Sequence, residues 1–188
     1  MTQNIDQDKQ IWYVAFGSNT VPEMLGRYVP VDDIEHRAVT IPHELYFAGK
    51  AWGAAPAFVE HVSDEDVVTP ARAYLLDADH LPDLLGGENR MHVEDWDCDV
   101  WSMRVGGVIE YPVSLDDNEG VGKYNALLRL EDIDDIPAVT VTTTHTLTRG
   151  GPSHSYLTVI REGLSDDHGV ALLEEHLQNA IERSEPDK

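Results

Sequence analysis

The order of strand-like and helix-like segments is the feature that most constrains the fold of this chain. Runs of β-branched, aromatic and apolar residues recur along most of the sequence, and two helix-like segments follow them. The expected strands cover residues 11–16, 43–48, 55–60, 71–76, 99–105, 124–129 and 138–145. The expected helices cover residues 21–28, 79–85 (stopped by Gly86-Gly87), 153–162 (stopped by Gly163) and 170–183. This order predicts an α+β fold with a mainly antiparallel sheet, and a closed β-barrel would remove the exposed edges of so many strands.

The size and composition of the chain fit one globular domain. It has 188 residues, of which 41% are hydrophobic and 26% charged, enough to form a core. We find no internal repeat or Gly/Ser-rich linker, so we expect a flexible tail at residues 1–10 and a single domain at 11–183. The polar N-terminus lacks the features of a signal peptide, and no apolar run approaches the roughly 18 residues of a membrane span. The sequence therefore predicts a cytoplasmic protein.

The net charge excludes two classes of partner. The formal charge is −22 at pH 7, and lysine occurs only at positions 9, 50, 123 and 188. Such a surface repels phosphate backbones and anionic lipids, so we expect neither nucleic acid nor a membrane as partner. The same composition is typical of a well-solvated acidic surface or of a protein that works in high salt, where ions screen self-repulsion.

Several kinds of catalytic centre are absent from the sequence. The lone Cys98 cannot form an internal disulfide, and Asp97 and Asp99 beside it oppose thiolate formation. The nine histidines are scattered, with no carboxylate or cysteine spaced to complete a metal site. There is no Gly-x-Ser-x-Gly elbow, Walker loop or dinucleotide fingerprint. We therefore expect no metal and no cofactor.

The sharpest local motif is a buried strand that runs directly into a glycine turn. Residues 11–16 (IWYVAF) end at Gly17-Ser18-Asn19, where Gly17 permits unusual backbone angles and Ser18 and Asn19 favour the start of a helix. Several backbone N–H groups at such a turn can point toward one spot and bind a carboxylate or phosphate. An ordinary strand–turn–helix junction with a capping residue has the same pattern, so this motif alone leaves both interpretations open.

Two further segments carry candidate site residues. Glu88 follows Gly86-Gly87 after the strand at 71–76, and a buried carboxylate at such a place can act as a general base. Near the end, Gly151-Pro152-Ser153 leads into a helix, where Ser153 can cap the helix or donate to a ligand. In isolation, Glu88 is one of 35 acidic residues and Ser153 marks a plain helix start.

Together, these motifs resemble the gamma-glutamylcyclotransferase-like superfamily. The turn Phe16-Gly17-Ser18-Asn19 is similar to its Tyr-Gly-Ser-Asn signature, with Phe16 in the place of the tyrosine. A strand followed by Glu88, and then Pro-Ser-x-x-Tyr at 152–156, occur in the order of that superfamily. The stretch 45–59 also resembles its second and third strands, so the resemblance spans about residues 11–176. It implies a small mixed β-barrel with flanking helices.

The resemblance also implies an activity. Members of the superfamily cleave a γ-glutamyl amide by attack of the substrate's own α-amine on its side-chain carbonyl, which releases 5-oxoproline and a free amine without a cofactor. The resemblance implies that Glu88 is the catalytic base. It also implies that the substrate, a small γ-glutamyl compound or related acyl amide, is bound by Phe16, Gly17, Ser18, Asn19 and Ser153.

The sequence departs from the superfamily pattern near the expected site. Phe16 lacks the hydroxyl of the usual tyrosine, Thr20 replaces an apolar residue, and residues 91–97 contain no tyrosine. Glu88 is placed across a variable loop, so Glu94 is the alternative base. The alternative function is a non-catalytic domain that binds or senses a small ligand in the same pocket. The sequence defines neither the substrate in detail nor the oligomeric state.

Overall fold

The structure is a computed structural model that describes residues 9–50, 54–90, 98–111, 113–115 and 123–185. Its strands are β1 (Gln10–Ala15), β2 (His36–Ile41), β3 (His43–Phe47), β4 (Ala57–Ser63), β5 (Thr69–Asp77), β6 (Val108–Glu110), β7 (Ala126–Ile133) and β8 (Ile136–Thr142). Its α-helices are α1 (Pro22–Leu25), α2 (Leu81–Asn89), α3 (His154–His168) and α4 (Val170–Ser184), and 3-10 turns form at η2 (Ser18–Thr20), η3 (Ala78–His80) and η4 (Val100–Ser102).

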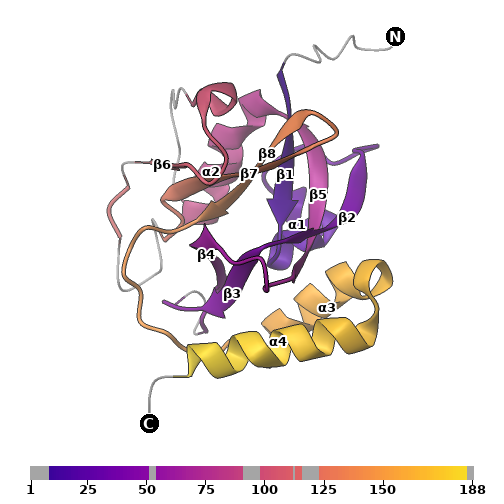
Figure 1. Cartoon of the computed structure of the whole chain (residues 1–188), viewed down its shortest axis with the longest axis vertical. Coiled ribbons are helices and arrows are strands. Elements are labelled where there is room, and N and C mark those ends of the chain that lie inside the picture. The colour runs from indigo at the N-terminus through magenta and orange to yellow at the C-terminus, as the bar shows by residue number, and fades with distance from the viewer. Residues whose placement is uncertain (1–8, 51–53, 91–97, 112, 116–122, 186–188) are drawn as a thin grey trace.

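Two sheets and a helical hairpin form the architecture (Figure 1). The larger sheet has the strand order β2-β5-β1-β8-β7-β6, in which β1 and β8 are parallel and all other neighbours are antiparallel. The smaller sheet is the antiparallel pair β3-β4. Helices α3 and α4 pack against each other, and they contact β5 and β3 respectively. The fold class is thus α+β with a mainly antiparallel sheet, as predicted.

Strand β1 is central because it is apolar on both faces. Its side chains alternate between two core clusters: Trp12 and Val14 face the cluster that includes α3 and α4, whereas Ile11 and Tyr13 face the cluster that includes α2. A continuous run of buried residues is what a strand covered on both faces requires. The run at 11–16 therefore fixes the middle of the sheet and delivers Gly17 to its end.

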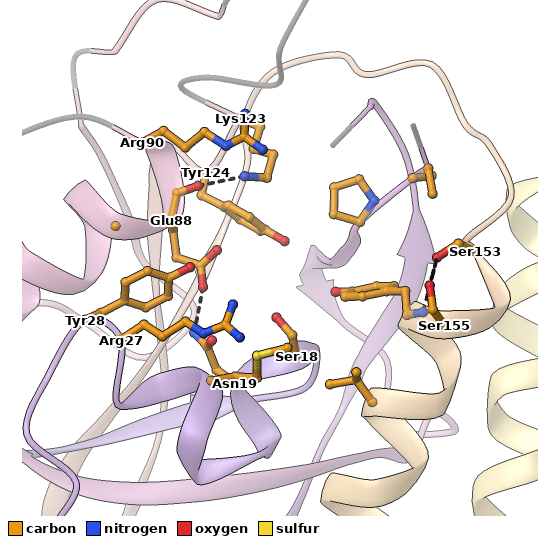
Figure 2. A pocket seen from close by; sticks show the side chains of 17 residues that line it. Ser18, Asn19, Arg27, Tyr28, Glu88, Arg90, Lys123, Tyr124, Ser153 and Ser155 are labelled. Atoms are coloured by element: carbon orange, nitrogen blue, oxygen red, sulfur yellow. Dashed lines mark hydrogen bonds between the residues drawn. The ribbon is translucent and has the colours of Figure 1, made fainter. Parts of the chain in front are cut away.

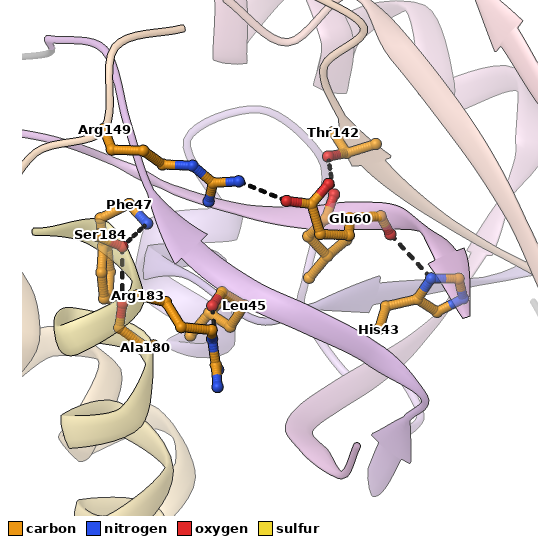
Figure 3. Close-up of polar contacts among 10 residues, drawn as sticks. His43, Leu45, Phe47, Glu60, Thr142, Arg149, Ala180, Arg183 and Ser184 are labelled. Atoms are coloured by element: carbon orange, nitrogen blue, oxygen red, sulfur yellow. Dashed lines mark hydrogen bonds and ion pairs between the residues drawn. The ribbon is translucent and has the colours of Figure 1, made fainter. Parts of the chain in front are cut away.

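The small sheet is attached to the rest of the protein by polar contacts (Figure 3). The hydroxyl of Thr142 on β8 donates to the carbonyl of Val59 on β4 at 2.6 Å, and Arg149 forms an ion pair with Glu60. Ser184 at the end of α4 accepts from the N–H of Phe47 and donates to Ala180, each at 2.7 Å. These bonds hold β3-β4 between β8 and α4.

The expectation of a closed barrel is wrong. Among the described residues, the larger sheet ends at β2 on one side and at the three-residue β6 on the other, and β3-β4 pairs separately. Pro42, between β2 and β3, has no N–H to donate to a ladder, so the chain leaves the larger sheet there.

Three predicted elements also differ. Residues 99–105 contain the turn η4 and no strand, because the Asp99 side chain accepts from the N–H of Ser102 and closes a turn. Helix α2 continues through Gly86-Gly87 to Asn89, and α3 continues through Gly163 to His168. Strands β2 and β6 were not expected from the sequence.

The regular elements of the described part begin at Gln10, which pairs with Asp77 at the start of β1, and end at Ser184 of α4, while residues 1–8 lie outside the described part. No helix in the described part is long and apolar enough to cross a membrane.

The close packing at Gly163 predicts that a side chain there lowers the stability of the protein. A Cβ on Gly163 would lie 2.2 Å from the Thr20 hydroxyl oxygen and 2.8 Å from the Thr20 backbone carbon, so α3 touches η2 directly. We expect Gly163→Ala to lower the free energy of unfolding by about 1–3 kcal/mol, although alanine is the better helix former. Gly151→Ala is the matched control, because a Cβ there meets no atom within 4 Å. Urea unfolding measures both, and equal stability of the two variants would contradict this packing.

Candidate active site

A cavity of about 340 Å³ opens where the turn after β1, the end of α2 and the start of α3 meet (Figure 2). Ser18, Asn19, Glu88 and Ser153 all line it. A small recess continues from it toward the sheet, lined in part by Phe16 and Gly17. The structure therefore brings together all six residues that the sequence singled out, from three distant parts of the chain. Glu94, the alternative base, lies outside the described residues.

Thr20 holds the turn that carries Ser18 and Asn19. Its hydroxyl donates to the carbonyl of Gly17 at 2.7 Å, and its own carbonyl accepts from Arg72 at 2.9 Å and from the Tyr74 hydroxyl at 2.8 Å. Arg72 also pairs with Asp167 of α3. The threonine that departs from the superfamily pattern thus links the turn to β5 and, through Arg72, to α3.

Position 17 of the turn has no room for a side chain. Its φ of −109° lies outside the left-handed region, so the expected need for unusual angles there is not the reason for glycine. A Cβ at Gly17 would lie 2.7 Å from the Tyr156 hydroxyl, which is the contact that excludes a side chain.

The backbone amides around Gly17 are partly used within the protein. The N–H of Thr20 donates to the Gly17 carbonyl at 3.2 Å. The Tyr156 hydroxyl accepts from the N–H of Ala57 at 3.2 Å and lies against the backbone of Ser18. Tyr156 thus occupies the place where an oxygen of a ligand was expected to meet the turn.

Glu88 lies in the last turn of α2 and is held from both sides. The Asn19 side-chain amide donates to Glu88 Oε1 at 2.6 Å and to the Tyr13 hydroxyl at 3.1 Å. Lys123 Nζ donates to the backbone carbonyl of Glu88 at 2.6 Å. The helix reaches Glu88 because Gly87 lies against the Tyr28 ring, where a Cβ would come within 2.1 Å of a ring carbon.

The surroundings favour the protonated form of Glu88 more than water does. Burial raises the pKa of the Glu88 carboxyl, while the positive charge of Lys123 and the hydrogen bond from Asn19 oppose that rise. Burial likewise lowers the pKa of Lys123, which Glu88 partly offsets. A carboxyl with a raised pKa takes up and returns a proton more readily near neutral pH than an exposed one does.

Four tyrosines surround Glu88 as neutral hydroxyls. Burial is the first cause that raises the pKa values of Tyr13, Tyr28, Tyr124 and Tyr156, and the charge of Glu88 adds to it in each case. The Tyr124 hydroxyl donates to the Ala57 carbonyl at 2.9 Å. Neutral hydroxyls can donate to an oxygen that gains negative charge during a reaction.

The structure gives Ser153 a definite local role. It is the N-cap of α3, and its hydroxyl oxygen accepts from the N–H of Tyr156 at 3.1 Å. This cap aims the first turn of α3, and with it Tyr156, at the Gly17 turn.

Sequence reasoning missed the cationic side chains of this cavity. Arg27, Arg90 and Lys123 line it with Glu88. They lie far apart in the sequence, and only the scarcity of basic residues in so acidic a chain could have drawn attention to them. In the described part of the chain, no group of three His, Cys, Asp or Glu side chains is arranged to hold a metal ion.

The comparison with solved structures places the fold among known ones. No protein-family model matches the sequence, and neither does any curated protein. Among solved structures, the chain is similar to the uncharacterized human protein loc79017 (TM-score 0.57, 16% identity, 96% of this chain and 90% of that one). It is also similar to a gamma-glutamyl cyclotransferase (TM-score 0.53, 16% identity, 95% and 90%). A third similar structure is YkqA from Bacillus subtilis (TM-score 0.52, 16% identity). The match covers 95% of this chain and 56% of that one.

The similarity to these solved structures establishes the fold of the chain. The chain has the gamma-glutamylcyclotransferase-like fold, as its sequence motifs predicted. At 16% identity they establish the fold alone, so the chemistry must be argued from the site.

The contacts of Glu88 predict how its pKa responds to substitution. Lys123→Met removes the charge, and Asn19→Ala the hydrogen bond, that hold the Glu88 pKa down, so each change should raise it further. Carboxyl ¹³C NMR titration measures this, with Glu88 assigned by comparison with Glu88→Gln. Lys9→Met is the charge-matched control, because Lys9 pairs with Asp79 outside the cavity. An unchanged Glu88 pKa in both site variants would show that these contacts do not act on the carboxylate.

Proposed function

We propose that this protein is a cofactor-independent cyclotransferase that cleaves a γ-glutamyl amine or related amide into 5-oxoproline and a free amine. The observation that carries the proposal is the partly buried carboxylate of Glu88, held by Asn19 at the end of a glycine turn in a fold shared with a gamma-glutamyl cyclotransferase. The same cavity also contains hydroxyls and arginines, which can bind the acyl and carboxylate parts of such a substrate.

The reaction requires one proton acceptor and a bent conformation of the substrate in which its α-amine meets its side-chain carbonyl. The α-amine nitrogen attacks the side-chain carbonyl carbon, and a five-membered lactam ring closes. Glu88 takes the proton from the attacking nitrogen and returns it to the leaving amine as the original amide bond breaks. No water is consumed, and both reacting groups belong to one molecule, so holding the substrate folded supplies much of the rate.

The side chains around Glu88 have matching roles in this proposal. Asn19 orients the carboxylate through its 2.6 Å hydrogen bond. The neutral hydroxyl of Tyr156, beside Ser18, can donate to the carbonyl oxygen as it becomes an oxyanion. Ser18 and Ser153 are polar groups on the cavity wall that can bind the rest of the substrate.

Removal of the base is the direct test of this function. The protein is incubated with γ-glutamyl amines and dipeptides, and 5-oxoproline and free amine are followed by mass spectrometry. Glu88→Gln keeps the shape of the side chain but cannot accept the proton, so kcat should fall by about 10²–10⁴-fold. The acid limb of the wild-type kcat/KM profile should lie above the ordinary pKa of a glutamate, because the base must be ionised and burial raises its pKa.

The matched control for Glu88→Gln is Glu110→Gln, since Glu110 lies on β6 and does not line the cavity. Turnover that is equal in wild type and Glu88→Gln would exclude Glu88 as the base. Binding without any turnover would favour the alternative, a domain that binds a small ligand.

A further inference from the structure

The larger sheet has an open edge at β2. Among the described residues, β2 is the last strand of the sheet and pairs with β5 alone (Figure 1). The N–H of Leu75 on β5 donates to the carbonyl of Glu35 at 2.9 Å, so in this antiparallel register the odd-numbered residues of β2 bond to β5. The backbone N–H and C=O groups of His36, Ala38 and Thr40 therefore point away from β5, toward the open edge.

The burial of β2 and its partner residues agree with an edge that is accessible. Pro70 lies opposite Thr40, at a position where the ladder between β2 and β5 needs no N–H donor. His36, Ala38 and Thr40 are exposed, whereas Val39 is half-buried. An exposed strand edge with free backbone groups is a template to which another strand can add.

A second cavity, of about 410 Å³, adjoins this edge. Residues 39–41 of β2 and 130–133 of β7 line it, together with Val14 and Ala138 of the inner strands. Strands β5, β1 and β8 separate β2 from β7 in the sheet, so the sheet curls to bring both to one cavity. Most of the lining residues are apolar, and the cavity can therefore take apolar side chains of a strand added to β2.

The charges around the edge and the cavity favour a cationic partner. Two arginines lie here, and carboxylates already neutralise both: Arg37 pairs with Asp134 at 2.6 Å, and Arg129 pairs with Asp132. Glu131 also lines the cavity and is exposed. A second copy of a chain with a formal charge of −22 would be repelled from this acidic edge, whereas a basic segment would be attracted to it.

We propose that β2 and the cavity beside it form a docking site for a partner protein, which adds an extended basic segment to β2 as a further strand. The backbone of this segment pairs with His36, Ala38 and Thr40, its apolar side chains enter the cavity, and its basic residues lie near the carboxylates. The inference goes beyond the proposed cyclotransferase function and does not depend on it. No residue lines both this cavity and the candidate active site.

Three peptides test the charge and the apolar character of the partner. The probe is fluorescein-labelled Lys-Lys-Val-Thr-Val-Lys-Lys, whose two valines lie on one face of an extended strand. In fluorescence anisotropy it should bind about 10-fold or more tightly than Glu-Glu-Val-Thr-Val-Glu-Glu and than Lys-Lys-Ser-Thr-Ser-Lys-Lys, and added salt should weaken its binding. Equal binding of the probe and the acidic peptide, or no binding of the probe, would overturn the inference.

Two variants separate the strand edge from the cavity. Thr40→Pro removes an N–H at the open edge but none of the bonds to β5, and Val105→Trp fills the cavity from an exposed position that lines it. Each should weaken binding of the probe by about 10-fold or more. Val170→Trp is the matched control, because Val170 is exposed on α4 and does not line the cavity. Val105→Trp leaves the backbone of β2 intact, so unchanged binding in this variant would exclude the cavity even if proline unfolded the strand.

Amide hydrogen exchange in the wild-type protein locates the added strand directly. The N–H groups of Arg37 and Val39 bond to β5 and should exchange slowly with or without the probe peptide, whereas those of Ala38 and Thr40 should become slow only when it binds. Fast exchange of Ala38 and Thr40 in the presence of bound peptide would place the peptide elsewhere and overturn the inference. Protection of the same two amides that rises with protein concentration, without peptide, would show a second copy at this edge and would also overturn it.

Discussion

The hydrogen bond between Asn19 and Glu88 is the contact on which the site depends. It joins residues that are 69 positions apart, one in the turn after the central strand and the other in the last turn of α2. Each partner is fixed independently, because Thr20 and its bonds to β5 hold the turn, while Lys123 holds the end of the helix. The carboxylate is therefore oriented before any ligand arrives, and preorganisation of this kind reduces the reorganisation that a reaction requires.

Close packing through glycines makes this arrangement possible. Gly87 admits the Tyr28 ring beside Glu88, Gly17 admits the Tyr156 hydroxyl, and Gly163 lets α3 touch Thr20. At each position a side chain would push apart two of the elements that meet at the cavity. The same elements bring scarce basic residues to one place, so among the described residues Arg27, Arg90 and Lys123 line the cavity of a strongly acidic chain.

The sequence predicted the parts of the structure that local patterns encode. The apolar run at 11–16 identified the central strand, and the order of three short motifs identified the fold and the residues that meet at the cavity. The patterns failed where tertiary contacts decide. Gly86-Gly87 and Gly163 resemble helix stops, but here they lie inside helices, and at Gly87 and Gly163 a neighbouring side chain occupies the space of the missing one. Strand number could not show that the sheet stays open, and no local pattern joins Arg27 to Arg90.

The identity of the oxygen in the product tests the central claim most directly. Cyclisation by the substrate's own amine consumes no water, whereas hydrolysis of the same amide places a water oxygen in the released glutamate. The protein is incubated with γ-glutamyl-alanine in H₂¹⁸O, and the acyl product is examined by mass spectrometry. The site described here predicts unlabelled 5-oxoproline in equal amount to the released alanine. Glutamate that carries ¹⁸O, or an intact substrate after prolonged incubation, would contradict it.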